Sequence, residues 1–165
     1  MPKEKTSFKE TFESFLDHKE NLKVVSVASA TQDGKPNSAA KLLVDIVAPN
    51  IVLFIDYKFT QTYANIQSNS RLSVSFMDDD SFTGYKLKGT CHILESGPEY
   101  QESSKAWEKR LTRYEAERII RRSKGLYSAR ESEHALPKDF VLVKFIASEA
   151  ALIKPDRVLR AVEKE

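Results

Sequence analysis

The sequence contains a single cysteine, Cys91, and this scarcity excludes several kinds of site. One cysteine cannot form a disulfide within the chain or a thiolate cluster for a metal. The three histidines also lie far apart and lack the spacing of metal ligands. We therefore expect a protein of the reducing cytoplasm without a metal site, in which Cys91 is a small residue of the core.

Long hydrophobic runs and an excess of one charge are missing as well. No window approaches the ~20 apolar residues of a membrane-spanning helix, and the charged N-terminus lacks an apolar stretch of signal-peptide length. The 26 basic residues are balanced by 24 acidic residues, which leaves a formal net charge of +2. This balance favours neither nucleic acid nor a membrane as a partner.

The sequence also lacks the glycine-rich signatures of the common nucleotide-binding folds. It has neither the glycine fingerprint of a dinucleotide-binding βαβ unit nor the lysine-bearing P-loop, and it has no internal repeat. Its 165 residues, 41% of them apolar, are enough for one full core and few for two. We expect one domain over residues 1–165.

What the sequence does contain is a succession of short strand patterns with few helices. Ser7 and Glu10 have the spacing of a capping box, and predict an amphipathic helix over about residues 6–20. Asp33-Gly34 predicts a hairpin, and a second long helix is expected over about residues 99–123. The other expected elements are strands at 22–30, 37–46, 51–55, 71–76, 85–94, 140–145 and 150–153, and short helices at 61–68 and 156–162. This order predicts a mainly β (α+β) fold, an antiparallel barrel of six to seven strands with peripheral helices.

The segment Thr60-Gln61-Thr62 directly follows a strand and opens a short helix. Thr60 is a good N-cap, and the unpaired N–H groups of a first helical turn attract anions. Two threonine hydroxyls at this point add donors that an ordinary turn does not need. The pattern indicates a phosphate site, although an N-cap turn without a ligand would have the same sequence.

Five segments in a fixed order resemble the pyridoxamine 5′-phosphate oxidase-like, FMN-binding split-barrel superfamily. They are the hairpin Asp33-Gly34-Lys35-Pro36-Asn37, the strand 38–44, and the segments 57–65, 69–74 and 84–89. The resemblance covers roughly residues 8–95, with weaker agreement over 139–155. It implies a six-stranded split β-barrel that works as a homodimer, with two FMN sites at the subunit interface.

The resemblance also implies which residues contact the cofactor. Lys86 matches an arginine that reaches FMN from the other subunit. The remaining contacts fall on Ala39, Ala40, Lys41 and Leu42 beside the flavin ring, on Ile55, Asp56 and Tyr57 near the ring and the ribityl chain, and on Thr60, Gln61 and Thr62 at the phosphate. The last three replace a serine-arginine-lysine clamp, so two positive charges are lost. We expect Lys41, Lys58 or the partner's Lys86 to compensate for the lost charge-assisted hydrogen bonds.

These matches imply an FMN-dependent oxidoreductase with an unidentified small-molecule substrate, in which no side chain need act as a catalytic acid or base. Pyridoxine phosphate is not the expected substrate, because the oxidases' C-terminal arginine-histidine motif is missing and Trp107 is the only tryptophan. Two alternatives stay open: a stress-associated protein that binds flavin or haem without turnover, and a deazaflavin-dependent reductase. We expect Trp107 to pack in the core, and the basic cluster at 118–124 to be a solvated helix end.

Overall fold

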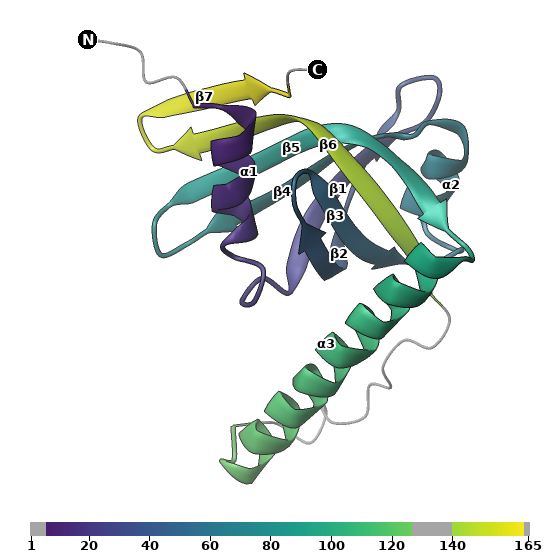
Figure 1. Ribbon diagram of the computed structural model, residues 1–165, viewed down its shortest axis with the longest axis vertical. Helices are drawn as coiled ribbons and strands as arrows, with labels where there is room; N and C mark the ends of the chain where they lie inside the picture. The colour runs from purple at the N-terminus through teal and green to yellow at the C-terminus, as the bar shows by residue number, and fades with distance from the viewer. Residues whose placement is uncertain (1–5, 127–139, 164–165) are drawn as a thin grey trace.

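The computed structural model describes residues 6–126 and 140–163. The strands are β1 Val24–Ala30, β2 Pro36–Val47, β3 Ile51–Asp56, β4 Arg71–Asp78, β5 Thr83–Leu94, β6 Val141–Lys154 and β7 Arg157–Val162; the helices are α1 Phe8–Leu16, α2 Gln61–Ser68 and α3 Pro98–Ser123. All strands belong to one antiparallel sheet of order β3-β2-β1-β4-β5-β6-β7, and β3 also pairs with β6. Six strands therefore close into a barrel, and β7 extends it on one side (Figure 1). The predicted barrel is confirmed.

The first hairpin forms where the sequence predicts it. β1 and β2 pair from Val24↔Leu42 to Ala30↔Pro36. Gly34 has a φ of +89°, a conformation in which other residues are strained, so Asp33-Gly34 can reverse the chain. The buried residues of β1 alternate with exposed ones, which places Val25 and Val27 inside the barrel.

β5 and β6 are the longest pair, and Gly89 permits their close approach. The register between the two strands shifts between Lys88 and Gly89, as at a β-bulge. A Cβ atom at position 89 would lie 1.9 Å from the carbonyl oxygen of Ile146. Only glycine allows the backbones to come this close.

Helix α1 lies across the barrel strands (Figure 1), and its aromatic residues join the barrel core. Its capping box forms as predicted, because Ser7 Oγ accepts from Glu10 N and Glu10 Oε2 accepts from Ser7 N. Phe12 and Phe15 are fully buried, and the ring of Phe15 packs against Tyr85 of β5 at 5.9 Å between centroids. The thiol of Cys91 belongs to the same core, as expected.

A second hydrophobic cluster joins α3 to the outside of the barrel. Trp107 is almost completely buried among Val44, Leu53, Ile55 and Leu142, so the packing role predicted for it is confirmed. The first half of α3 carries all of its buried residues, and Figure 1 shows the second half running away from the barrel.

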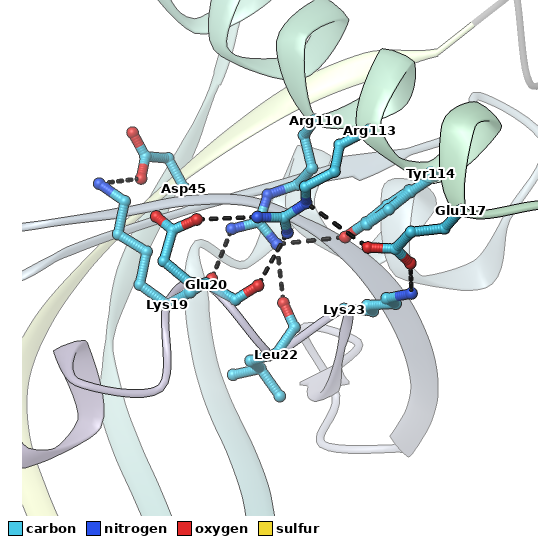
Figure 2. Close-up of polar contacts among 9 residues, drawn as sticks. All are labelled: Lys19, Glu20, Leu22, Lys23, Asp45, Arg110, Arg113, Tyr114 and Glu117. Atoms are coloured by element: carbon cyan, nitrogen blue, oxygen red, sulfur yellow. Dashed lines mark hydrogen bonds and ion pairs between the residues drawn. The ribbon is translucent and has the colours of Figure 1, made fainter. Parts of the chain in front are cut away.

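A buried arginine fastens α3 to the loop between α1 and β1 (Figure 2). Arg110 donates hydrogen bonds of 2.7 Å to the carbonyl oxygens of both Lys19 and Leu22, and one of 3.1 Å to the hydroxyl of Tyr114. These contacts satisfy two loop carbonyls with a charged donor, which fixes the angle between helix and barrel.

The C-terminal elements differ from the prediction in two ways. The strands expected at 140–145 and 150–153 are one continuous strand, β6, and the helix expected at 156–162 is the strand β7. Pro155 and Asp156 form a two-residue turn, after which β7 pairs with β6 from Lys154↔Arg157 to Glu149↔Val162. Pairing with a long neighbouring strand outweighs the weak helical pattern of these six residues. The sequence also predicts a loop around Pro137, and that segment lies outside the described residues.

Within the described ranges, every helix is too short or too polar to cross a membrane.

Candidate functional site

A pocket of about 300 Å³ opens where β2, β3 and the start of α2 meet. Its lining residues are Asn37, Ala39, Ala40, Lys41, Leu42, Ile55, Tyr57, Thr60, Gln61 and Thr62, and we call it the β2–α2 pocket. Every residue predicted at the cofactor lines this pocket, except Asp56 and Lys86. The structure therefore brings together side chains that are up to 23 positions apart in sequence, Ala39 and Thr62 among them. Their contacts to a ligand stay a prediction.

Thr60 caps α2, as its position predicts, but its hydroxyl is occupied on both sides. The Oγ1 atom accepts a hydrogen bond from Tyr63 N at 3.0 Å and donates one to Asp56 Oδ1 at 2.8 Å. The hydroxyl hydrogen expected to serve a phosphate is thus already used inside the protein. Thr60 holds the helix start in place and leaves ligand contact to its neighbours.

Thr62 is the threonine that keeps a donor available. Its side chain is fully buried, and Oγ1 accepts from Asn37 Nδ2 at 3.1 Å. A hydroxyl that accepts from an amide still has its own hydrogen to donate. The N–H groups of Gln61 and Thr62 lie in the first helical turn and have no acceptor within the helix. Gln61 and Thr62 both line the end of the pocket where the sequence predicts a phosphate.

A network of hydrogen-bonded polar side chains adjoins this end of the pocket. Asn37 and Asn65 both donate to Ser29 Oγ, at 3.3 and 3.0 Å, and the side-chain amide of Gln61 donates to Asn65 Oδ1 at 2.8 Å. Asn37 was missed in the sequence. Its signal was the two-residue period of a strand, since Asn37, Ala39 and Lys41 share one face of β2.

Lys41 and Asp56 form a buried ion pair at the wall of the pocket. Lys41 Nζ lies 2.6 Å from Asp56 Oδ1, and the two side chains are 6% and 0% exposed. Oδ1 also accepts from Tyr57 N at 2.7 Å, whereas Oδ2 has no hydrogen-bond partner among the described residues. The carboxylate neutralises the only cation among the lining residues. Lys41 therefore brings no net charge to a phosphate, contrary to one of the compensations expected above.

Aromatic rings stand at the rim of the pocket. Tyr57 and Phe59 are stacked at 5.4 Å between centroids and 11° between planes, and Phe59 is exposed. Burial, with the negative charge of Asp56 as the smaller cause, raises the pKa of Tyr57, so its hydroxyl stays protonated and able to donate. A planar ligand could extend this stack. Phe59 was not predicted at the site, because an exposed phenylalanine in a loop has no distinguishing pattern.

Lys86 is exposed on β5 and lines a different pocket of about 280 Å³, on the surface formed by β5, β6 and β7. In one copy of the chain it is not part of the β2–α2 pocket. Contact between Lys86 and a ligand held there would require a second copy, as the resemblance implies. Lys58 is also exposed and does not line the pocket.

The model of one protein family, described as pyridoxamine 5′-phosphate oxidase, matches residues 8–152. No curated protein matches the chain significantly.

Several solved structures share the fold. A protein from Clostridium acetobutylicum, related to general stress protein 26 of Bacillus subtilis and described as of the pyridoxinephosphate oxidase family, is 19% identical with a TM-score of 0.64; the match covers 94% of this chain and 95% of that one. A pyridoxamine 5′-phosphate oxidase-related, FMN-binding protein from Nostoc punctiforme is 10% identical with a TM-score of 0.57, covering 95% and 90%. A heme binding protein from Mycobacterium smegmatis is 12% identical with a TM-score of 0.62, covering 96% of this chain and 59% of that one.

Proposed function

Because this chain belongs to the pyridoxamine 5′-phosphate oxidase family, we propose that it binds FMN in the β2–α2 pocket and acts as an oxidoreductase on a small molecule. The observation that carries the proposal is the convergence of the residues that match the family's cofactor contacts on one pocket. An FMN-binding protein of the same fold supports the choice of cofactor.

The residues of the pocket fit the parts of a flavin nucleotide. Ala39, Leu42 and Ile55 contribute apolar side chains to the pocket, and Tyr57, which is stacked on Phe59, lines it as well. At the other end, Thr62 and the first turn of α2 offer neutral donors to a phosphate. The volume of about 300 Å³ is at the lower limit for a ligand pocket, so part of the nucleotide would extend beyond it.

In this proposal the chain binds and orients the flavin, and the bound flavin supplies the transfer of hydride or electrons. Thr60 and Asp56 fix the position of α2, Thr62 donates to the phosphate, and Lys41 holds its ammonium group at the wall. No side chain of the pocket is assigned as a general acid or base. The tight Lys41–Asp56 pair would hold this wall in one conformation.

We also propose that the protein is a homodimer in the cytoplasm, with Lys86 of a second copy completing the phosphate site. The neutral wall of the pocket supports this part, since a dianionic phosphate without any cation is poorly stabilised. The lone buried Cys91, which needs no oxidising compartment, is in keeping with the location.

A second candidate is binding of haem or flavin without turnover. The heme binding protein of similar fold and the missing positive charges at the phosphate end favour it. A deazaflavin in place of FMN is the remaining alternative within the oxidoreductase class. Absorbance separates haem from flavin by its Soret band, and mass spectrometry of the released cofactor separates FMN from a deazaflavin.

The first test is a fluorescence titration of FMN with the purified full chain. We expect quenching with saturable binding, loss of binding in Ala39→Trp, which fills the pocket, and unchanged binding in Ala28→Trp, which makes the same change on an exposed face of β1. Oxidation of NADH or NADPH by the loaded protein would then establish turnover. Absence of FMN binding by the folded wild type would contradict the proposal.

A further inference from the structure

Another pocket of about 300 Å³ lies between α3, the α1–β1 loop and β2, and we call it the α3 pocket. It shares no lining residue with the β2–α2 pocket. Most of its lining side chains are charged: the cations are Lys19, Lys109, Arg110 and Arg113, and the acids are Glu20 and Asp45. The pocket therefore has an excess of positive charge.

Three of the four cations come from one face of α3. Ala106, Lys109, Arg110 and Arg113 have the spacing i, i+3, i+4 and i+7, which places them along one stripe of a helix. Ala106 contributes only a methyl group, so the stripe has space beside its long basic side chains.

Both acids of the α3 pocket are already neutralised by a cation of the same pocket. Asp45 Oδ1 lies 2.7 Å from Lys19 Nζ, and Glu20 Oε2 lies 2.8 Å from Arg113 Nη1 (Figure 2). Within the part of the chain that the structure describes, neither Lys109 nor Arg110 forms an ion pair with a carboxylate. Two positive charges of the pocket are thus left without a counter-charge.

Arg110 carries one of these charges in a buried position. Its side chain is only 7% exposed, and its hydrogen-bond acceptors are neutral oxygens: the carbonyls of Lys19 and Leu22 and the hydroxyl of Tyr114. These bonds use three of the five N–H groups of the guanidinium. A buried charge is costly unless an opposite charge accompanies it, so the arrangement favours an anion as a further partner.

A second guanidinium adds to the positive potential at this point. Arg113 Nη2 donates to Glu20 O at 2.8 Å, and Arg110 Nη2 donates to Lys19 O, the preceding carbonyl of the same loop. Two like charges are therefore held on consecutive carbonyl oxygens. The Nε atom of Arg113 is buried and has no hydrogen-bond partner among the described residues. A donor without a partner beside an uncompensated cation is the chemistry of an anion site.

We propose that the α3 pocket binds a small phosphate compound in its dianionic form, either inorganic phosphate or a phosphate monoester. A dianion matches the two uncompensated charges, whereas a monocarboxylate would leave one of them unmatched. The planar guanidinium group suits phosphate oxygens. Val44 and Ala106 also line the pocket and offer an apolar surface to the organic part of a monoester. This site is separate from the flavin phosphate and does not depend on flavin binding.

Calorimetric titration of the full chain with inorganic phosphate tests the site, at about pH 8, where a phosphate is mainly dianionic, and at constant ionic strength. We expect saturable binding that Lys109→Gln weakens about tenfold, because one charge-assisted hydrogen bond is lost. Arg110→Lys keeps the charge but loses the planar fork, and should also weaken binding. The matched control Lys105→Gln removes the same charge one turn earlier in α3, outside the pocket, and should change nothing.

The β2–α2 pocket needs its own arm, because it is also proposed to hold a phosphate. Ala39→Trp fills that pocket and should leave binding of inorganic phosphate intact, whereas Lys109→Gln should leave binding of FMN intact. Phosphate binding by a wild type that does not bind FMN would contradict the proposed function and support the α3 site. Loss of phosphate binding in Ala39→Trp, with normal binding in Lys109→Gln, would assign the phosphate to the β2–α2 pocket and overturn the inference.

Phenyl phosphate distinguishes the two sources of the dianion. Tighter binding of phenyl phosphate than of inorganic phosphate would identify a monoester site, and weaker binding would identify a site for inorganic phosphate. Absence of saturable binding to either compound would overturn the inference, as would equal binding by wild type and Lys109→Gln. Lys109 is exposed, so its variant tests the site even if Arg110→Lys does not fold, which circular dichroism would show.

Discussion

Lys41 Nζ lies 2.6 Å from Asp56 Oδ1, and neither side chain is open to solvent. The two residues come from neighbouring strands of the barrel and meet behind the wall of the β2–α2 pocket. A charged pair in this position is costly to desolvate, and each charge depends on the other. The pair therefore makes the wall of the pocket both neutral and sensitive to single substitutions.

Breaking this pair should destabilise the protein strongly. We expect Lys41→Met or Asp56→Asn to lower the free energy of unfolding by about 3–5 kcal/mol, because each leaves a buried polar group without its partner. Urea unfolding measures the change, and the double variant should cost less than the two single variants together. Lys88→Met removes the exposed pair with Glu149 and should cost less than about 1 kcal/mol. A double variant that costs as much as the two single variants together would show that Lys41 and Asp56 are not coupled.

The two threonines of α2 should differ in what they affect. Thr60→Ala removes an N-cap and should cost about 0.5–2 kcal/mol of stability. Thr62→Val removes the donor that is available to a ligand and should weaken FMN binding about 3- to 10-fold. Calorimetric titration with FMN and with riboflavin distinguishes the two effects, because only FMN carries the phosphate. Equal weakening of both ligands in Thr62→Val would place the hydroxyl away from the phosphate.

Gly89 should tolerate no side chain. In Gly89→Ala the new Cβ would meet the backbone carbonyl of Ile146 at 1.9 Å, so β5 and β6 must separate. We expect a loss of about 3 kcal/mol or more, or failure to fold. Gly84→Ala is the matched control on the same strand: its nearest contact is the Ile153 side chain at 3.3 Å, which can move. Thermal unfolding of the two variants should show a much smaller shift for Gly84→Ala.

Cys91 should be inert at neutral pH. Burial raises the pKa of its thiol from 9.0 to about 12, so the neutral form is favoured in the folded state. At pH 8 the thiolate is about a thousandfold rarer than in an unfolded chain, and labelling by a disulfide reagent should require unfolding. The same difference stabilises the folded state below about pH 9 and is lost as the pH rises from 9 towards 12. Cys91→Ala should flatten that part of the urea-unfolding profile; an unchanged slope would contradict the assignment.

Local patterns predicted those parts of the fold that depend on neighbours in sequence. The Ser7–Glu10 capping box, the hairpin at Asp33-Gly34 and the N-cap at Thr60 all form as expected, because each is stabilised within a few residues. The strand β7 was mistaken for a helix because its stability comes from pairing with β6. A six-residue edge strand has too little pattern of its own to indicate that pairing.

The candidate site was predictable only in part, because several of its hydrogen bonds join residues that lie in different elements. The resemblance supplied most of the residues that line the β2–α2 pocket, but it assigned Lys41 and Thr60 as free donors. Both are occupied by Asp56, whose carboxylate lies 15 and 4 positions away in sequence. Asn37 was overlooked because its contact with Thr62 spans two elements.

By itself, the sequence determined the barrel class and the start of α2, since periodicity and capping act over short distances. The set of residues near the pocket came from the resemblance to a family. Only the tertiary structure decided which of those residues keep a hydrogen free to donate, because Lys41 and Thr60 both donate to Asp56. It also decided that the end of α3 lies beyond the barrel. That placement follows from Arg110 and Arg113 binding a loop some 90 residues away, and no local pattern encodes such a contact.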